Sequence, residues 1–367
     1  MVHLPSPELS AVDALAAALR AEPLPAGFDL SDHMVDAAES EGVAALLART
    51  AVAASAPAAV AFRLRAILAG GEALLAVRDA ELASVLTRLA SGGVNPVVIK
   101  GAHLAHTIYA SPVLRPRQDT DLVIAWEEQA TLAALLETAG YRRKIHVRGT
   151  LILGQCHFER TDRSGIVHAL DVHWRVAAPL VFRHVLPVAA LRASRVPIPA
   201  LGPDAWGPGR AHALLIACVH LVAHHAGNPV LLWLHDIARL AEALDDRDAV
   251  RFLEGAAAAG ISTVCASALD RARRHFDGPA LAALAVRAHA QSVPGEEASA
   301  RVLRGSRPID GLWLDLRCCD GWRERFTLLR EHVCPDPEYM RATTAPTGWL
   351  PLAYARRAIA GFGKWVG

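Results

Sequence analysis

The sequence predicts an α+β protein in which one mixed α/β unit lies between two helical regions. Apolar residues recur at spacings of three and four over residues 7–92, which is typical of helices. Short β-branched runs then alternate with helical patterns from 94 to 178. Helical periodicity returns from about residue 210 and continues into the C-terminal tail.

Four segments follow from these changes of pattern. We expect an N-terminal helical region at 1–93, an α/β domain at 94–200, a helical domain at 201–305 and a C-terminal helical tail at 306–367. The stretch LGPDAWGPGR at 201–210 marks one boundary, because glycine and proline interrupt regular structure.

The elements of the α/β unit are predicted in order along the chain. NPVVIK (95–100) is expected to form a strand, GAHLAHTIYA (101–110) a short helix, TDLVIA (120–125) a strand and EEQATLAALLETAGY (127–141) a helix. YRRKIHVRG, TLILGQCHFERT and SGIVHALDVHWRV are expected to be further strands, with a turn at 161–165 that Asp162 caps.

Composition and charge limit the classes of partner. The 367 residues are 53% hydrophobic and 20% charged, so the chain can bury a sizeable core. Its 38 basic and 37 acidic residues leave a net charge of +1, and no global charge draws it to nucleic acid or to a membrane.

Cysteine usage and the apolar segments indicate a cytoplasmic protein with reduced thiols. The six cysteines form no C-x-x-C pair, and the adjacent Cys318 and Cys319 are a poor start for a disulfide framework. The N-terminus lacks the basic and apolar regions of a signal peptide. The apolar segment 211–244 carries five histidines and Pro229, so it predicts two buried helices and no transmembrane segment.

Two aspartates stand one residue apart at the start of the second strand, in RPRQDTDLVI. In a strand, Asp119 and Asp121 would point to the same face about 6.5–7 Å apart, where like charges repel. A hard divalent cation removes this conflict, and oxygen ligands suit Mg²⁺. Asp171 in HALDVHWRV is the third candidate, because its strand can lie beside the first and complete a two-metal site. The alternative is that these aspartates cap a turn.

Basic residues and a glycine near the acids favour phosphate binding. Lys100 and Gly101 lie at a strand-to-helix junction, where glycine lets the backbone approach a phosphate and a helix N-terminus attracts anions. Arg115 and Arg117 precede the acids directly. They would either neutralise the acids or contact phosphate, and the sequence leaves both roles open.

VVIKGAHLAHTIYASPVLRPRQDTDLVI, a helix ending in AGY, and ALDVHWRV together resemble the DNA polymerase β-like nucleotidyltransferase superfamily. The resemblance is closest to a bacterial branch of uncharacterised nucleotidyltransferases. It implies a polymerase β-like palm, a mixed sheet with flanking helices, between the two helical regions. The superfamily pattern is Gly-Ser or Gly-Gly about ten residues before Asp-x-Asp. Here Gly101 precedes Ala102 and the gap is longer, so Lys100 and backbone amides would replace the missing hydroxyl.

The resemblance implies a two-metal nucleotidyltransferase that uses Mg²⁺ or Mn²⁺. It would move a nucleoside monophosphate from a triphosphate such as ATP to an acceptor, which stays open among a small molecule, a peptide, a protein and an RNA end. Asp119 and Asp121 would bind both metals, and Asp171 would bind the catalytic metal and orient or deprotonate the acceptor hydroxyl. The triphosphate would be held by Lys100, Gly101, Arg115 and Arg117. The alternative is a catalytically inactive nucleotide-binding or scaffold protein on the same fold.

For several histidines and two basic segments, the sequence is consistent with more than one role. His173 shares a strand face with Asp171, so it would support a carboxylate by hydrogen bonding or act in catalysis. Four of the five histidines of 211–244 keep three interpretations: core residues bonded to backbone or Asp236, zinc ligands, or part of a face that closes over the nucleotide through His224 and Trp233. These four are His220, His224, His225 and His235. The stretch 141–148 is either a solvated edge strand or a phosphate-contacting surface, and the basic C-terminal segment either packs on the protein or touches a membrane.

Overall fold

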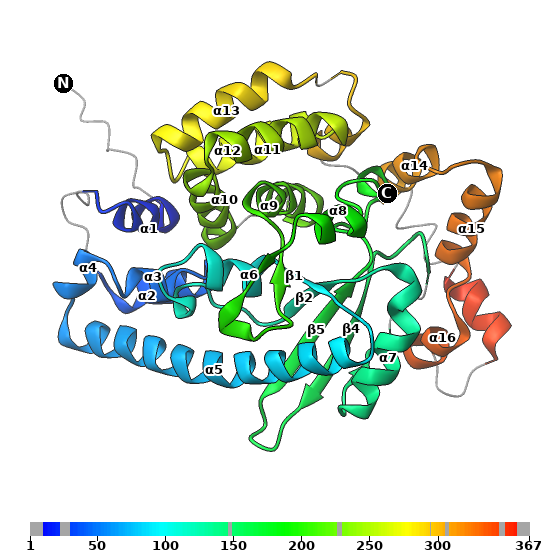
Figure 1. The fold of residues 1–367 in the computed structure, drawn as a ribbon, viewed down its shortest axis with the longest axis horizontal. Coiled ribbons are helices and arrows are strands. Elements are labelled where there is room, and N and C mark those ends of the chain that lie inside the picture. Colours follow the sequence, from blue (N-terminus) through cyan, green and yellow to red (C-terminus); the bar gives the residue numbers. More distant parts are fainter. Residues whose placement is uncertain are drawn as a thin grey trace.

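Helices surround a five-stranded mixed sheet in the computed structural model, which describes residues 10–22, 30–145, 149–225, 230–293, 295–304, 308–344 and 349–357 (Figure 1). The sheet order is β1-β2-β5-β4-β3. Its strands are β1 (Val97–Ile99), β2 (Thr120–Val123), β3 (Arg142–Arg143), β4 (Gln155–Thr161) and β5 (Val167–His173). β2 and β5 are parallel, and the other neighbouring pairs are antiparallel.

The predicted order of elements in the α/β unit is confirmed. α6 (Lys100–Thr107) follows β1, and α7 (Gln129–Thr138) follows β2. Asp162 caps the turn between β4 and β5, where its Oδ1 accepts hydrogen bonds from the backbone N–H groups of Ser164 and Ile166. The strand expected over 141–148 is shorter than predicted, because within the described part of that stretch only the two residues of β3 pair with β4. β3 is an edge strand, as one of the two interpretations expected.

Alternation along the strands separates the sheet into an apolar face and a polar face. Val98, Leu122, Leu170 and Phe158 belong to one buried cluster with residues of α5 (Ala58–Ser91) and α7. These two helices therefore cover the apolar face. The other face carries the polar residues of β2, β4 and β5, because successive strand residues point to opposite sides.

A helical layer lies over the polar face (Figure 1). It consists of α9 (Arg210–His225), α10 (Leu231–Ala243), α11 (Asp246–Ala258), α12 (Ser262–Arg273) and α13 (Pro279–Gln291). These helices share one apolar core with α1 (Ala11–Leu19), α2 (Asp32–Ser40) and α3 (Ala44–Leu47), and Val97, Ile99 and Val123 join it from the sheet. The segment 211–244 thus contains two helices that pack in the core, as predicted. None of the described helices is long and apolar enough to cross a membrane.

Shorter elements complete the fold. α4 (Ala51–Ala54) precedes α5, α8 (Val188–Ala193) follows the sheet, and a small two-stranded sheet pairs β6 (Val196–Pro197) with β7 (Trp206–Gly207). The stretch 201–210 lies in this region, between η4 (Pro199–Leu201) and α9. The division of the chain into four segments stays a prediction.

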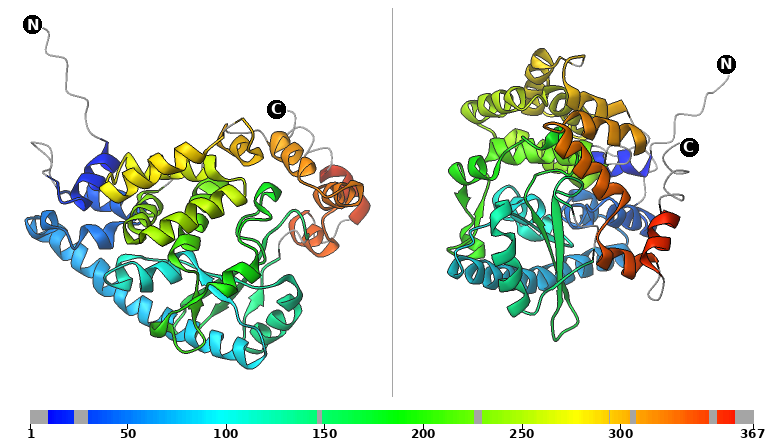
Figure 2. Two further views of the ribbon diagram at one scale, coloured as in Figure 1. Left: turned by 45° about the horizontal axis from the view of Figure 1, so that its top comes forward. Right: turned by 90° about the vertical axis from the view of Figure 1, so that its right-hand side faces the viewer.

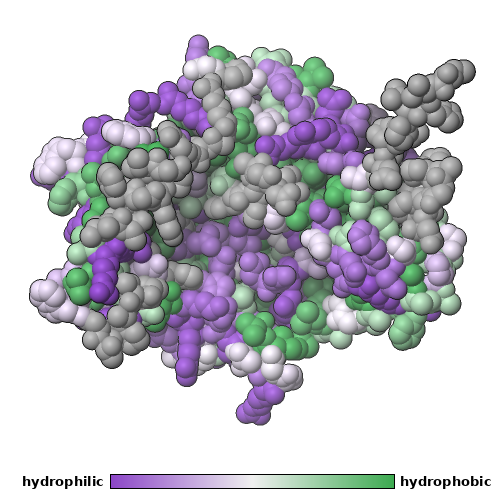
Figure 3. Space-filling view, turned by 180° about the vertical axis from the view of Figure 1, so that it is seen from behind, coloured by the Kyte–Doolittle hydropathy of each residue, from purple (hydrophilic) through white to green (hydrophobic). Residues whose placement is uncertain are grey.

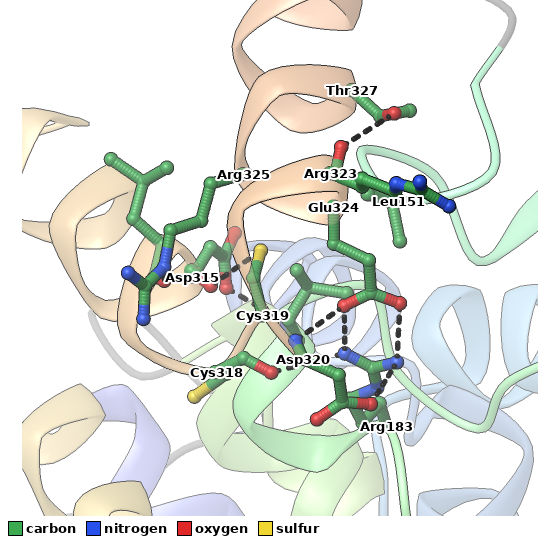
Figure 4. Close-up of polar contacts among 12 residues, drawn as sticks. Leu151, Arg183, Asp315, Cys318, Cys319, Asp320, Arg323, Glu324, Arg325 and Thr327 are labelled. Atoms are coloured by element: carbon green, nitrogen blue, oxygen red, sulfur yellow. Dashed lines mark hydrogen bonds and ion pairs between the residues drawn. The ribbon is translucent and has the colours of Figure 1, made fainter.

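The C-terminal helices run down one side of the molecule (Figure 2). They are α14 (Pro308–Arg317), α15 (Trp322–Val333) and α16 (Pro337–Thr344). The guanidinium of Arg183 donates to both carboxylate oxygens of Glu324, at 2.9 Å each, and to the backbone oxygen of Cys318 (Figure 4). Asp315 of α14 accepts the backbone N–H of Leu180 at 2.8 Å. These contacts fasten α14 and α15 to the segment that follows the sheet.

A second anchor joins α15 to the loop before β4. The buried carboxylate of Glu331 accepts backbone N–H groups from Thr150 at 2.8 Å and from Leu151 and Ile152 at 3.0 Å. The helix at 350–357 contacts the segment that follows α15, because its Tyr354 hydroxyl donates to the backbone oxygen of Pro335 at 2.7 Å. Packing on the protein is therefore the role the structure gives to this part of the basic C-terminal segment.

The cysteines do not pair with one another, and one face of the molecule is largely hydrophilic (Figure 3). All six cysteines are free, and Cys156, Cys218, Cys265 and Cys319 are buried. Seen from behind, hydrophilic residues gather across the middle of the surface, with hydrophobic residues scattered around them (Figure 3).

Candidate active site

Asp121 and Asp171 are paired in register on the parallel strands β2 and β5. Val123 pairs with His173 in the same ladder, so the two carboxylates and the imidazole share the polar face. One ligand atom from each of Asp121, Asp171 and His173 lies within 4.8 Å of the other two, and this group can hold a metal ion. Across the described ranges, no second group of three histidine, cysteine or acidic residues is this close.

The carboxylate of Asp121 is buried, and it contacts the side chains of a lysine and a histidine. Lys100 Nζ lies 2.6 Å and His173 Nε2 lies 2.8 Å from Asp121 Oδ1. Burial by itself raises the pKa of Asp121, but Lys100 and His173 outweigh it and hold that pKa well below its ordinary value. The predicted proximity of His173 to a carboxylate is thus realised at Asp121.

Asp171 is held from β4, the strand on its other side. Gln155 Nε2 donates to Asp171 Oδ2 at 3.0 Å, and His157 Nδ1 lies 2.5 Å from Asp171 Oδ1. His157 Nε2 also lies 2.8 Å from Glu159 Oε1. The hydrogen bond to Asp171 raises the pKa of His157, despite partial burial.

Asp119 lies in the same cavity but outside the close group of three. It precedes β2, which begins at Thr120, so strand alternation does not set the direction of its side chain. Desolvation raises the pKa of Asp119, and the nearby carboxylates of Asp121 and Asp171 raise it further. The three predicted acids therefore line one cavity, and the charges of Asp121 and Asp171 act on Asp119. Asp121 lies on β2, whereas Asp119 lies just before it.

The junction between β1 and α6 has an unusual backbone. Lys100 has φ +52°, in the left-handed region that only a few non-glycine residues occupy. Such backbone strain persists only where the surrounding structure imposes it, and here it turns the chain so that Nζ reaches Asp121. A Cβ on the following Gly101 would lie 3.2 Å from Arg115 Nη1 and 3.4 Å from Arg117 Cβ. Gly101 thus allows the arginine-bearing loop to pack against α6.

The two arginines pair with acids that the sequence did not single out as their partners. Arg115 Nε donates to Asp236 Oδ1 at 2.9 Å and Nη2 donates to Asp236 Oδ2 at 2.7 Å, with the pair buried against α10. Arg117 Nη2 donates to Asp79 Oδ1 of α5 at 2.8 Å. Neither guanidinium forms an ion pair with Asp119, Asp121 or Asp171. Arg117 Nε and Nη1 are buried without a hydrogen-bond partner among the described residues.

A cavity of about 740 Å³ lies between the sheet and the helical layer. Every predicted site residue whose side chain is described lines it, except His173. Its wall comprises Lys100, Gly101, Arg115, Arg117, Asp119, Asp121 and Asp171, together with His220, Trp233 and Asp236 of the helical layer. The cavity is large enough for a nucleotide-sized ligand.

The histidines of the helical layer have separate positions. His220 meets Trp233 edge to face, with ring centroids 5.7 Å apart, at the cavity wall. His235 Nδ1 lies 2.9 Å from the hydroxyl of Tyr109, and burial lowers the pKa of His235 to about 4. The side chains of His224 and His225 lie outside the described residues, so the role predicted for His224 stays a prediction.

The sequence did not identify the residues that form hydrogen bonds to Asp171 and to the two arginines. Gln155 and His157 bind Asp171, and Asp79 and Asp236 bind the arginines. The polar residues Gln155, His157 and Glu159 alternate with Cys156 and Phe158 in QCHFERT. That alternation indicates a polar strand face and would have identified the two partners of Asp171.

The fold and the site define a protein with a carboxylate-rich, metal-capable centre in a cavity that also carries buried cationic groups. Residues 30–277 match a family described as uncharacterised nucleotidyltransferase. The match covers more than half of the 367 residues, and the chain belongs to this family. No curated protein matches the sequence.

Proposed function

We propose that the protein is a metal-dependent nucleotidyltransferase that moves a nucleoside monophosphate from a triphosphate to an acceptor hydroxyl. The observation that carries the proposal is the register pair Asp121–Asp171, with Lys100 bound to Asp121 at the wall of the cavity. Family membership supports the reaction class. The order β1-α6-β2, with acids on β2 and β5, supports a polymerase β-like palm.

The donor set fits Mg²⁺ or Mn²⁺. Carboxylate oxygens suit both ions, and the imidazole nitrogen of His173 is a ligand type that Mn²⁺ accepts more readily than Mg²⁺. Asp121 and Asp171 would hold the metal, and Asp119 would supply a third carboxylate from the same cavity. The bound metal would neutralise phosphate charge and stabilise both the attacking and the leaving oxygen.

Phosphate binding falls to the cationic groups of the cavity. Lys100 Nζ and the unpaired N–H groups of Arg117 would hold the triphosphate, because buried donors without a partner are costly until an acceptor binds. Arg115 is neutralised by Asp236, so its contribution would be to hold the loop that carries Arg117. Gly101 would let that loop approach α6.

The protein residues then order the transfer. The acceptor oxygen forms a bond to the α-phosphorus, the bond from that phosphorus to the bridging oxygen breaks, and pyrophosphate leaves. Asp171 would orient the acceptor hydroxyl and take its proton, while Gln155 and His157 fix the direction of the carboxylate. His173 would orient Asp121 in the same way.

Thermal unfolding with each nucleoside triphosphate, with and without Mg²⁺ or Mn²⁺, tests the proposal. A ligand that binds only the folded state raises its stability, so we expect a shift that needs both nucleotide and metal. The shift should disappear in Asp121→Asn. If no nucleotide stabilises the protein in the presence of either metal, the proposal is wrong and the scaffold alternative stands.

A further inference from the structure

A second cavity, of about 570 Å³, opens beside the candidate active site. It lies where β2 and β5 end and β4 begins, and α15 and the helix at 350–357 form its outer wall. Its lining includes the aromatic residues Trp126, Trp174 and Tyr354 and the basic residues Arg143, Lys144 and Arg330. Trp126 and Trp174 meet edge to face, with ring centroids 5.0 Å apart.

Gln155 connects the two cavities. Its side chain lines both of them, and its Nε2 donates to Asp171 Oδ2 at 3.0 Å. Across the sheet, the order of the relevant residues is Lys100 after β1, Asp121 on β2, Asp171 on β5 and Gln155 on β4. Lys100 therefore lies at the β1 end of this row, and the second cavity lies at the β4 end, where Gln155 separates it from Asp171 by one side chain.

The second cavity has hydrogen-bond donors that lack acceptors. Trp174 Nε1 and Gln129 Nε2 are both buried without a partner in the part of the chain that the structure describes. Arg143 and Arg330 are exposed to the cavity and form no ion pair with described residues. A buried donor without an acceptor is costly, so these groups are suited to a ligand with several acceptor oxygens.

The acidic residues of the lining are already engaged. Glu331 accepts three backbone N–H groups of the loop before β4, and Asp336 accepts the backbone N–H groups of Glu338 and Tyr339 at 3.1 Å each. Lys144 is paired with Glu159. The cations that remain in the lining are those of Arg143 on β3 and Arg330 on α15. Their guanidinium groups can bind a phosphate or carboxylate with two hydrogen bonds.

We propose that this second cavity binds the acceptor, a small molecule that carries a phosphate or carboxylate group and presents a hydroxyl to Asp171. The inference rests on the proposed transfer reaction and adds its substrate class. The hydroxyl oxygen attacks the α-phosphorus of the triphosphate, its proton passes to Asp171, and pyrophosphate leaves with the electrons of the broken bond. Arg330 and Tyr354 lie beyond residue 277, where the family match ends, so this chain's own C-terminal helices would select the acceptor.

Binding of three small probes to the full chain tests the proposal. Glycerol 3-phosphate and glycerate each combine a hydroxyl with an oxyanion, and glycerol is the uncharged control. We expect saturable calorimetric binding at millimolar concentration of at least one of the two anions and none of glycerol. The anion that binds more tightly distinguishes a phosphate from a carboxylate acceptor. Equal binding of glycerol, or no saturable binding of either anion, would overturn the inference.

Variants of the two arginines locate the site. Arg143→Gln and Arg330→Gln should each weaken anion binding about tenfold or more, because each removes a charged hydrogen-bond donor to the anion. The matched control is Arg323→Gln on the same helix as Arg330, since Arg323 stacks on Trp322 outside the cavity. Circular dichroism checks that all three variants fold. Unchanged anion affinity in both cavity variants would contradict the proposal.

Two further readouts separate this inference from the proposed function. Metal-dependent stabilisation by a nucleoside triphosphate should be the same in Arg143→Gln, Arg330→Gln and the unmodified chain, and its absence in all of them would count against the transfer reaction itself. Incubation with radiolabelled triphosphates and cell extract should place the label in a small anionic product. Label found only in RNA or protein, with nucleotide binding intact, would overturn the acceptor class and leave the transfer reaction standing.

Discussion

Asp121 and Asp171 lie in register on adjacent parallel strands, yet each carboxylate is held by a different histidine. His173 Nε2 lies 2.8 Å from Asp121 Oδ1, and His157 Nδ1 lies 2.5 Å from Asp171 Oδ1. Each acid therefore has its own partner that sets its direction. Strand pairing brings the two acids together, and hydrogen bonds from residues of β4 and β5 set the direction of each carboxylate.

Replacing the acids should remove activity without unfolding the protein. Asp119→Asn, Asp121→Asn and Asp171→Asn should each lower metal-dependent transfer about a thousandfold or more, because a bound metal contributes several kcal/mol to the transition state. Labelled transfer in extract and thermal unfolding are the measurements. Asp162→Asn is the control, since Asp162 caps the turn at the far end of β4. An active Asp119→Asn protein would contradict the metal-binding role proposed for Asp119 and the two-metal mechanism that the resemblance implies.

The backbone at Lys100 can be tested with two substitutions of the same residue. Both Lys100→Gly and Lys100→Ala remove the ion pair with Asp121. Only alanine keeps a Cβ at φ +52°, so we expect the glycine variant to be about 1 kcal/mol more stable in urea unfolding. Both variants should bind nucleotide weakly. Equal stability of the two would show that this backbone conformation is not strained.

The buried pair Arg115–Asp236 should be a strong contact between the α/β unit and the helical layer. Arg115→Met leaves Asp236 as a buried charge without its main partner, and this should lower the free energy of unfolding by about 3–5 kcal/mol. Arg239→Met on the same helix, α10, breaks the exposed Arg239–Glu242 pair and should cost no more than about 0.5 kcal/mol. Chemical denaturation compares them. Similar losses in the two variants would argue against the contact.

Stability should fall when the solution becomes acidic, in part because of His103. This residue is 2% exposed, and burial, followed by the charge of His106, lowers its pKa to about 4 from an ordinary value of 6.5. The unfolded chain then takes up a proton that the folded chain does not. The contribution is present in full above pH 6.5 and is lost as the pH falls toward about 4.

The loss attributable to His103 is on the order of 3 kcal/mol. His103→Leu cannot be protonated, so its free energy of unfolding should change less between neutral and mildly acidic pH than that of the unmodified chain. Urea unfolding at a series of pH values measures the slope. The same slope in both proteins would show that His103 is not responsible.

Much of the local structure was predictable because its signals are local. Strand alternation has a period of two, which placed Asp171 and His173 on one face, and the strand-to-helix junction identified Lys100. The turn at Asp162 likewise depends on side-chain contacts within four residues. Helical periodicity identified the two helices of 211–244 for the same reason.

The sequence by itself therefore determined which acidic and basic residues are candidates for the site, and on which elements they lie. Only the tertiary structure decided the pairing of β2 with β5 and the partner of each charge. Arg115 meets Asp236 at a separation of 121 residues, and Gln155 binds Asp171 and lines both cavities only once β4 lies beside β5. Such contacts depend on which distant segments pack together, and local periodicity carries no information about that choice.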